Sequence, residues 1–394
     1  MPSLSSIYLD HNATTPFAPE ALAAMLPFLS GNYEGRFGNP SSIHAAGREA
    51  RVAVDDGRDR LARLLGARPN EIIFTGSGTE ADNLAVLGIA RNRARIGSER
   101  HIITCVTEHH AVLHATEFLE KHEGFRITRL PVDKRGMVDP EALRTAITPK
   151  TALVSLHSAN NETGTLQPIE AIGAVCHEHG VLFHSDMVQS FGKLPVRVDQ
   201  AEGLSALSIA AHKFYGPRGA GALWLRSGVS VDSITYGGAQ ENGRRPGTEN
   251  TAAIAGMAVA AELAVQSIVE ELPRQAALRD RLWQGILAVF PAAVRNGAWD
   301  DPERQLSNTL NVSFPGLDGE MLIINCDLAG LCVSSGSACM SGSPQSSHVL
   351  LAMGLSREIA AASLRFSLGK GTTEACIDAA IERLAGVIAR VRQT

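Results

Sequence analysis

Residues 208–217 read Ser-Ile-Ala-Ala-His-Lys-Phe-Tyr-Gly-Pro and continue a short apolar run that begins at Leu204. The run predicts a buried strand from Leu204 to Ala211, and the glycine and proline residues after it predict a loop. Lys213 then lies on a loop at the edge of a sheet. Burial lowers the pKa of a lysine and frees an amine that can attack a carbonyl group. Lys213 is therefore a candidate to carry a Schiff base to a pyridoxal cofactor; a surface lysine after a strand is the alternative.

Strands, polar loops and helices alternate along most of the chain. This succession predicts an α/β fold with a mainly parallel sheet and helices on both of its faces. In such sheets ligands bind beyond the carboxyl ends of the strands. Polar clusters follow several predicted strands directly, so we expect residues from distant parts of the sequence to meet at one edge. These residues are Gly78, His109, Asn161, Asp186 and Lys213.

Residues 76–81, Gly-Ser-Gly-Thr-Glu-Ala, connect a predicted strand to a helix and match the G-x-G-x-x-A pattern of dinucleotide-binding loops. The dinucleotide interpretation is weak, because 75 residues precede the motif and Glu99 and Glu108 are poorly placed to close the next strand. A glycine-rich turn before a helix also binds phosphate through free N–H groups and the helix dipole. A ligand-free helix start, with Thr79 and Asp82 as a capping box, is the alternative.

Two further residues have a chemical interpretation at this edge. Asp186 follows a predicted strand, and a carboxylate beside the nitrogen of a pyridoxal ring keeps that nitrogen protonated, so that the ring can accept electrons. A helix-capping aspartate is the alternative. His109 begins a predicted helix, where a histidine can cap, stack or bind metal. We expect no metal, because His114 alone does not supply the further ligands.

The composition of the 394 residues narrows the class of protein. The hydrophobic fraction is 44% and the formal net charge is −5, which gives no electrostatic argument for binding nucleic acid or an acidic membrane. Met1–Asp10 lacks the apolar segment of a signal peptide, and the longest apolar run, Ala252–Ala261, is too short to span a bilayer. We therefore expect a cytoplasmic protein. None of the six cysteines is spaced as C-x-x-C, so we expect neither zinc nor disulfides, and mostly buried thiols.

The last third of the chain predicts a second, smaller unit. Residues 252–263 and 273–290 have the pattern of two helices that lead into it. We expect residues 16–260 to form a large domain that binds the cofactor. Residues 1–15 and 261–394 should form a smaller α+β domain.

Cys339 lies in an unusual segment of this smaller unit. Seven of the fifteen residues 334–348 are serine, a composition typical of a mobile loop. An exposed thiol in such a loop can act as a nucleophile when its thiolate is populated. An incidental cysteine in a linker is the alternative.

Together these motifs resemble the cysteine desulfurases of the NifS/IscS type, within the class V group of pyridoxal-phosphate enzymes that have the aminotransferase fold. The resemblance covers nearly the whole chain, from Tyr8–Thr15 to Arg365–Gly369. It is specific, because independent motifs agree in order and spacing. The motifs are Gly38-Asn39-Pro40-Ser41-Ser42, Thr107-Glu108-His109, Asn160-Asn161-Glu162-Thr163-Gly164, Ala211-His212-Lys213 and Ser335-Gly336-Ser337-Ala338-Cys339.

The resemblance implies roles around the ring of pyridoxal phosphate. Lys213 would form the Schiff base and later move protons at the substrate Cα atom. Asp186 would pair with the ring nitrogen, and His109 would stack on the ring and help to shuttle a proton. Gln189 would hydrogen-bond the ring hydroxyl. Asn161 would orient the cofactor and the substrate.

The resemblance also implies roles at the phosphate, the substrate and the sulfur. Gly78, Thr79 and His212 would hold the phosphate, joined in a homodimer by Thr248 of the partner subunit. Arg365 would bind the substrate carboxylate as a bidentate fork. Cys339 would accept the sulfur of L-cysteine. The chain departs from the family at Ala210, where a serine that contacts the phosphate is common.

The expected activity is conversion of L-cysteine to L-alanine, with transfer of sulfur as a persulfide on Cys339 to an acceptor such as an iron–sulfur scaffold protein. A selenocysteine lyase or a class V transaminase of a small amino acid is the nearest alternative. Transaminases do not need the serine-rich loop, whereas a selenocysteine lyase would use the same scaffold. A non-catalytic scaffold that binds a sulfur carrier is a further alternative, yet it would tolerate loss of Lys213.

Overall fold

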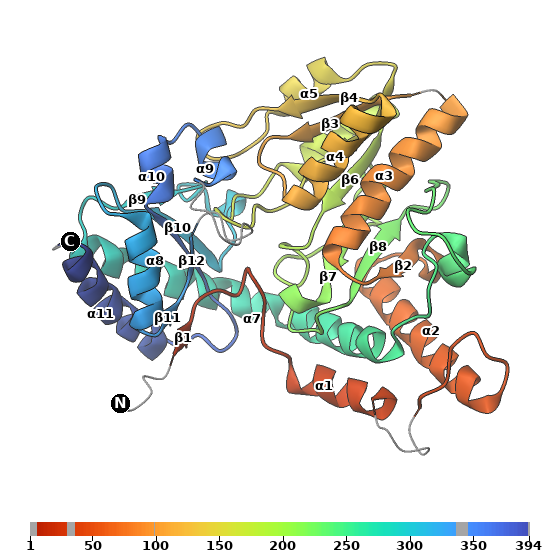
Figure 1. The fold of residues 1–394 in the computed structure, drawn as a ribbon, viewed down its shortest axis with the longest axis horizontal. Coiled ribbons are helices and arrows are strands. Elements are labelled where there is room, and N and C mark those ends of the chain that lie inside the picture. The colour runs from red at the N-terminus through yellow and green to blue at the C-terminus, as the bar shows by residue number, and fades with distance from the viewer. Residues whose placement is uncertain (1–5, 30–35, 98, 336–345, 393–394) are drawn as a thin grey trace.

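A seven-stranded sheet forms the centre of the larger part of the molecule. The computed structural model describes residues 6–29, 36–97, 99–335 and 346–392 (Figure 1). In spatial order the strands are β2 (Ile72–Thr75), β8 (Gly221–Leu225), β7 (Ala206–Ala210), β6 (Leu182–Asp186), β5 (Thr151–Ser155), β3 (His101–Cys105) and β4 (Arg126–Leu130). The strands from β7 to β4 run parallel to one another. Strand β8 alone runs opposite to the other six strands, which confirms a mainly parallel α/β sheet.

Helices cover both faces of this sheet, because successive strand residues point to opposite faces and both sets are apolar. Ile73 packs in the cluster with α3 (Gly78–Gly97) and α4 (His110–Glu123). Phe74, the next residue of β2, packs in the cluster of the opposite face. The helices of that face are α2 (Ala45–Leu65), α5 (Pro140–Ala146), α6 (Ile169–Glu178) and the first part of α7 (Thr251–Val289), with α1 (Pro19–Met25) packed against α7.

A smaller antiparallel sheet lies next to the C-terminal half of α7, beside α8 and α11 (Figure 1). Its strands, in spatial order, are β12 (Ser334–Ser335), β13 (Ser363–Ser367), β10 (Thr309–Ser313) and β9 (Val294–Asn296). A separate pair joins β1 (Ile7–Tyr8) to β11 (Leu331–Cys332) in parallel. The helices here are α8 (Gly319–Leu328), α9 (His348–Ala352), α10 (Arg357–Ala361) and α11 (Glu374–Val391). Leu310 and Phe366 form a second core with Leu384 of α11 and Leu282 of α7.

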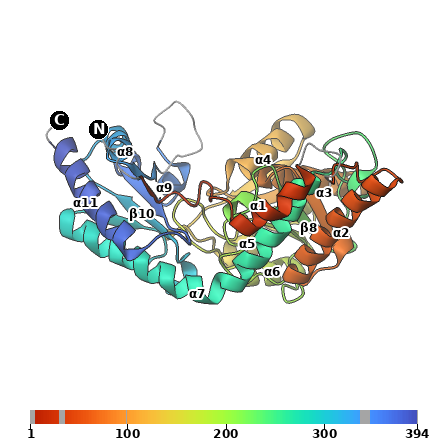
Figure 2. The same ribbon diagram turned by 90° about the horizontal axis from the view of Figure 1, so that it is seen from below.

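Helix α7 links the two cores as one element, which corrects the prediction of two helices. It runs from Thr251 to Val289 with Pro273 inside it, and it changes direction along its length (Figure 2). A proline kinks a helix but need not end it when both halves are held by packing. Met257 packs in the core of the large sheet and Leu282 in that of the small sheet. The predicted domain boundary at residue 260 falls inside this helix, so the division into domains stays a prediction.

By length and composition, α7 is also the one described helix that is apolar enough to cross a membrane. In the fold, 56% of its apolar window is buried, as in the core helix of a soluble protein. Cys105, Cys176 and Cys326 are buried, and Cys332 and Cys376 are partly exposed. Cys339 lies outside the described residues. Short 3₁₀ turns occur at Leu26–Phe28, Pro69–Glu71, Ala211–Lys213, Gln240–Gly243 and Pro302–Arg304.

Candidate active site

A cavity of about 300 Å³ lies at the carboxyl ends of the parallel strands, next to the first turn of α3. It brings together nine of the eleven residues that the sequence predicts for the site, although they come from both sheets. These nine are Gly78, Thr79, His109, Asn161, Asp186, Gln189, His212, Lys213 and Arg365. Of the other two, Thr248 is exposed and does not line the cavity of its own chain, and Cys339 lies outside the described residues.

Lys213 ends a single 3₁₀ turn, Ala211–Lys213, rather than lying on a loop. Strand β7 ends at Ala210, one residue earlier than predicted, because the Phe214 N–H bonds to the Ala211 carbonyl and closes the turn. The Lys213 Nζ atom donates to the backbone carbonyls of Asn12, at 2.6 Å, and Ala13, at 2.8 Å. The turn therefore aims the amine into the cavity and toward the N-terminal segment.

Asp186 is the last residue of β6 and forms part of the cavity floor. Burial raises the pKa of its carboxyl to about 6, although the Val188 N–H donates to Oδ1 at 2.9 Å and opposes the rise. Asp82 of α3 is also buried, and burial together with the Asp186 charge raises its pKa well above the ordinary value. A cationic ring nitrogen in the cavity would favour the ionised form of Asp186.

Two histidines face the cavity as neutral rings. Burial, with the nearby Lys213 charge, lowers the pKa of His109 and of His212 to about 4. His109 is also the N-cap of α4, where its Nδ1 accepts from the Ala111 N–H at 3.1 Å. A neutral imidazole can stack on a cofactor ring without adding charge, and it can accept or donate a proton.

The first turn of α3 supplies the end of the cavity that suits an anion, since its N–H groups have no partner within the helix. Gly78 begins the helix, and a Cβ atom there would lie 2.8 Å from Val188 Cγ2, so only glycine permits this approach. The predicted capping box of Thr79 and Asp82 is wrong. Ser77 Oγ accepts from the Glu80 N–H at 3.0 Å, and Asp82 is buried too deeply to cap.

Arg365 reaches the cavity from β13 of the small sheet. It is 1% exposed, and its guanidinium donates to Asp10 Oδ1 at 2.6 Å and to the Asn161 carbonyl at 3.1 Å. Among the described residues its Nε atom has no hydrogen-bond partner. Arg365 therefore keeps a donor for a small carboxylate.

Asn12 is the central residue that the sequence reasoning missed as part of the site. Its backbone carbonyl accepts from Lys213 and from Gln189 Nε2, the latter at 3.0 Å. Its side-chain Nδ2 donates to the Asn161 carbonyl at 3.1 Å. The only signal was its place in a polar cluster after a short predicted strand, and its partners lie more than 100 residues away in the sequence.

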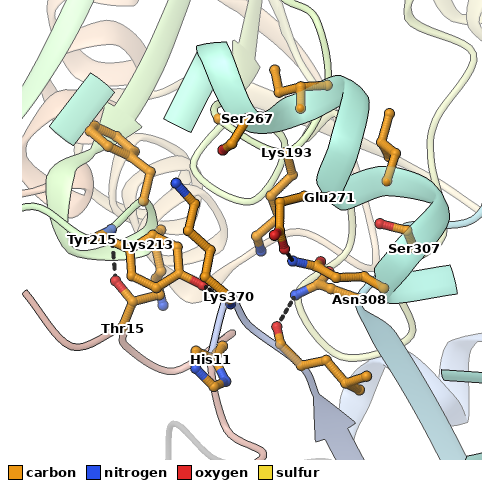
Figure 3. Close-up of a pocket in the computed structure, with 16 residues that line it drawn as sticks. His11, Thr15, Lys193, Lys213, Tyr215, Ser267, Glu271, Ser307, Asn308 and Lys370 are labelled. Carbon is orange, nitrogen blue, oxygen red and sulfur yellow. Dashed lines mark hydrogen bonds between the residues drawn. The ribbon is translucent and has the colours of Figure 1, made fainter. Parts of the chain in front are cut away.

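A second, smaller cavity of about 30 Å³ borders Lys213, and Figure 3 shows that Lys193 lines it too. The Lys193 Nζ atom donates to Asn12 Oδ1 at 3.0 Å and to Gln189 Oε1 at 2.8 Å. Burial, and then the charges of Lys213 and Arg365, lowers the pKa of Lys193 well below its ordinary value. Lys193 thus fixes the Gln189 side chain through its oxygen.

A buried cluster of Cys105, Glu108 and His157 lies behind the cavity, and its potential ligand atoms fall within 4.8 Å of one another. Hydrogen bonds within the cluster already use these atoms. Glu108 Oε1 accepts from His157 Nδ1 at 2.9 Å and from Cys105 Sγ at 3.1 Å. The absence of a metal stays a prediction.

A family model described as "Aminotransferase class-V" matches residues 7–380. The chain belongs to the class V aminotransferase family. "Cysteine desulfurase IscS" of Clostridium botulinum is 46% identical over 98% of this chain and 95% of its own. A solved "NIFS-LIKE PROTEIN" is 35% identical with a TM-score of 0.89, over 98% of this chain and all of its own. The solved structure "SspA in complex with cysteine" is 36% identical with a TM-score of 0.79, and the match covers 92% of this chain and 99% of that one.

Class V aminotransferases of this type are pyridoxal-phosphate enzymes, and the cavity fits that cofactor. It offers a lysine amine, a buried carboxylate and a helix N-terminus in one space. The glycine at position 78 lets the start of α3 pack closely against Val188 and Ala210, which also line the cavity. Lys213, Asp186 and the first turn of α3 would hold the aldehyde, the ring nitrogen and the phosphate respectively.

Glu162 gives this class V aminotransferase a pH-dependent stability. It is buried beside Asn161 and accepts a hydrogen bond from Ser347 Oγ. Burial raises its pKa to about 7, against the lowering effects of the Ser347 bond and the Arg365 charge. Because this value lies above the ordinary 4.5, the free energy of unfolding falls as the pH rises from about 4.5 to 7, by about 3 kcal/mol.

We therefore expect Glu162→Gln to raise the melting temperature at pH 8 and to leave it nearly unchanged at pH 5. At pH 8 the substitution removes a buried negative charge, whereas at pH 5 the native carboxyl is already neutral. Thermal unfolding of the apo-protein at both pH values measures the difference. Glu178→Gln, at an exposed carboxyl paired with Arg144, is the control and should show no gain at pH 8. An equal gain at both pH values would contradict the assignment.

Proposed function

We propose that the chain is a cysteine desulfurase that converts L-cysteine to L-alanine and passes the sulfur, as a persulfide on Cys339, to an acceptor protein for iron–sulfur cluster assembly. The observation that carries this proposal is the convergence of Lys213, Asp186 and Arg365 on one cavity. An amine, a carboxylate and an arginine there match the aldehyde and ring of pyridoxal phosphate and the carboxylate of an amino acid. Relatives along nearly the full length carry the same printed activity.

The described residues prepare the substrate. Bound pyridoxal phosphate supplies an electron sink for the bonds at the amino-acid Cα atom. Arg365 holds the carboxylate, which directs the Cα–H bond toward the Lys213 amine. Lys213 Nζ removes that proton and later returns one, and the neutral imidazole of His109 is placed to accept or donate another. Asn12 and Gln189 keep the amine and the ring edge in position.

The described residues on either side of the Cys339 segment lie next to residues that line this cavity or adjoin its lining. Ser334 pairs with Arg365 between β12 and β13, and its hydroxyl donates to Asp10 at 2.9 Å. Ser347 bonds to Glu162, the neighbour of Asn161. Cys339 follows Ser335 by four residues, so the chain between them spans at most about 14 Å. This reach supports Cys339 as the sulfur acceptor.

The sulfur step balances without an added oxidant. The Cys339 thiolate attacks the substrate sulfur, a sulfur–sulfur bond forms and the carbon–sulfur bond breaks. The electron pair of the broken bond returns to the carbon side, which takes up a proton and leaves as alanine. A thiol acceptor then removes the outer sulfur from Cys339.

We also propose that two copies of the chain form a homodimer in the cytoplasm. Thr248 is exposed and does not line its own cavity, as expected for a residue that contacts the phosphate of the partner subunit. Large apolar side chains are exposed on and beside α1 and α2, which supports a covered surface there. They are Leu22, Leu26, Leu29, Ile43 and Val52.

Product analysis tests the activity. The purified chain, loaded with pyridoxal phosphate, is incubated with L-cysteine and a thiol reductant, and alanine and sulfide are measured. Equal amounts of alanine and sulfide are expected. A keto acid in place of alanine would identify a transaminase. Turnover of selenocysteine without turnover of cysteine would identify a selenocysteine lyase.

Ala210 sets the strength of phosphate binding in this proposal. It is buried at the end of β7 and lines the cavity where a serine would offer a hydroxyl. A hydrogen bond to a charged group contributes about 1.5–3 kcal/mol. We expect Ala210→Ser to lower the dissociation constant of pyridoxal phosphate about tenfold. Pyridoxal, which lacks the phosphate, is the control ligand and should bind both proteins equally. A gain for both ligands would contradict a phosphate contact.

A further inference from the structure

His157, which lines the cofactor cavity, forms a buried ion pair with Glu108, which does not line it. Glu108 is fully buried at the turn after β3, and His157 is 3% exposed after β5. Both the Nδ1 atom and the backbone N–H of His157 donate to Glu108 Oε1, at 2.9 and 2.8 Å. Two bonds from one residue to one oxygen fix the carboxylate and the imidazole relative to each other.

The pair carries opposite charges. Burial is the largest single effect and would lower the pKa of His157, but the charges of Glu108 and Cys105 and the hydrogen bonds with both residues together raise it well above the ordinary value. Burial would raise the pKa of Glu108, but the His157 charge and hydrogen bonds bring it below the ordinary value. Each partner thus holds the other in its ionised form.

The pair also joins the two loops that carry site residues. Glu108 precedes His109, which faces the cavity, and its backbone carbonyl accepts from His348 Nε2 at 3.0 Å. His157 itself lines the cavity, and the next residue, Ser158, donates its N–H to the Asp186 carbonyl at 2.9 Å. The His157 side of the pair is therefore linked to the backbone of Asp186 by a hydrogen bond one residue away.

The charges near Asp186 differ in whether they favour its ionised form. Apart from burial, Glu108 disfavours the Asp186 carboxylate, whereas His157 and Lys213 favour it. Asp82 is the other buried acid that lines the cavity, and burial together with the Asp186 charge raises its pKa, which disfavours its charged form. His184 beside it is neutral, since burial lowers its pKa to about 4. His157 is therefore the buried cation that pairs directly with Glu108 and offsets its charge at the cavity wall.

We propose that the His157 imidazolium is a positioning group whose charge cancels that of Glu108, so that Asp186 stays ionised against the ring nitrogen of the cofactor. This inference rests on the cofactor role of Asp186 in the proposed function. It makes a prediction that a purely structural pair would not make. Removing the His157 charge alone should weaken the binding of pyridoxal phosphate. Removing the charges of His157 and Glu108 together should leave this binding nearly unchanged.

The test measures the dissociation constant of pyridoxal phosphate from the apo-protein for four variants. His157→Gln should raise it about tenfold, because one pKa unit at Asp186 corresponds to a factor of ten. Glu108→Gln should leave it within about threefold of the native value. The double variant should return to within about threefold, since no uncompensated charge remains. Asp186→Asn should bind more weakly than all of these.

Thermal unfolding of each apo-protein shows whether it is folded. If Glu108→Gln weakens binding as much as His157→Gln and the double variant is worse than either, the pair is only structural and the proposal is overturned. Metal bound stoichiometrically by the purified protein and lost in His157→Gln would also overturn it. If Asp186→Asn binds pyridoxal phosphate as tightly as the native chain, the site assignment itself fails. If Asp186→Asn binds pyridoxal phosphate more weakly but His157→Gln binds it as the native chain does, the proposed role of the ion pair is overturned and the site assignment stands.

Discussion

Lys213→Ala is expected to abolish the visible absorbance band of the bound cofactor and to lower alanine formation by roughly 10³-fold or more. Two functions are lost together. The Nζ atom is the only described lysine amine in the 300 Å³ cavity that could bond the cofactor aldehyde, and it is the group that moves the Cα proton. Absorbance spectroscopy and product analysis on the same sample measure both losses.

Lys121→Ala is the matched control for this experiment. Lys121 lies on the surface of α4, where it pairs with Glu117. Its loss should leave the visible band and the rate unchanged, because surface ion pairs contribute little. A normal visible band in Lys213→Ala would reject Lys213 as the residue that bonds the cofactor.

Cys339→Ser should give the opposite pattern, with the visible band kept and sulfide production lost. The described residues that would hold the cofactor are other side chains, and the substitution leaves them in place. Serine replaces a thiol by an alcohol that does not ionise near neutral pH, so no nucleophile attacks the substrate sulfur. We expect the rate of sulfide release to fall at least about 10²-fold, measured with saturating L-cysteine.

Cys376→Ser is the control that tests a second candidate thiol for the acceptor role. Cys376 is partly exposed, and the hydroxyl and N–H bonds with Thr373 lower its pKa, so it is the chief rival thiolate among the described cysteines. It lies at the start of α11, outside the cofactor cavity. Native sulfide release by Cys339→Ser, with loss in Cys376→Ser, would move the acceptor role to Cys376.

The sequence predicts those features that depend on local pattern. Apolar runs followed by polar loops identified the parallel strands. Because the carboxyl ends of parallel strands meet at one edge of the sheet, five residues were predicted to lie together there. The cavity contains all five, namely Gly78, His109, Asn161, Asp186 and Lys213. The resemblance added Arg365, which no local pattern assigns to that edge because it comes from the other sheet.

Features that depend on distant contacts were missed. Pro273 looks like a helix end in the sequence, but packing in two cores carries α7 through it. Asn12 and His157 have no motif of their own, and their roles follow from partners brought close by the fold. Thr79 and Asp82 have the spacing of a capping box, yet burial of Asp82 leaves Ser77 as the cap.

The contacts of Asn12 reach almost the full length of the polypeptide. Its backbone N–H donates to Ser367 Oγ at 2.9 Å, and Asp10 pairs with Arg365. During synthesis the N-terminal residues of the pocket therefore emerge from the ribosome hundreds of residues before the C-terminal ones. A nascent chain cannot hold the vitamin-derived ligand in its finished pocket until translation is nearly complete, so release of the full-length chain and acquisition of the cofactor should be close in time.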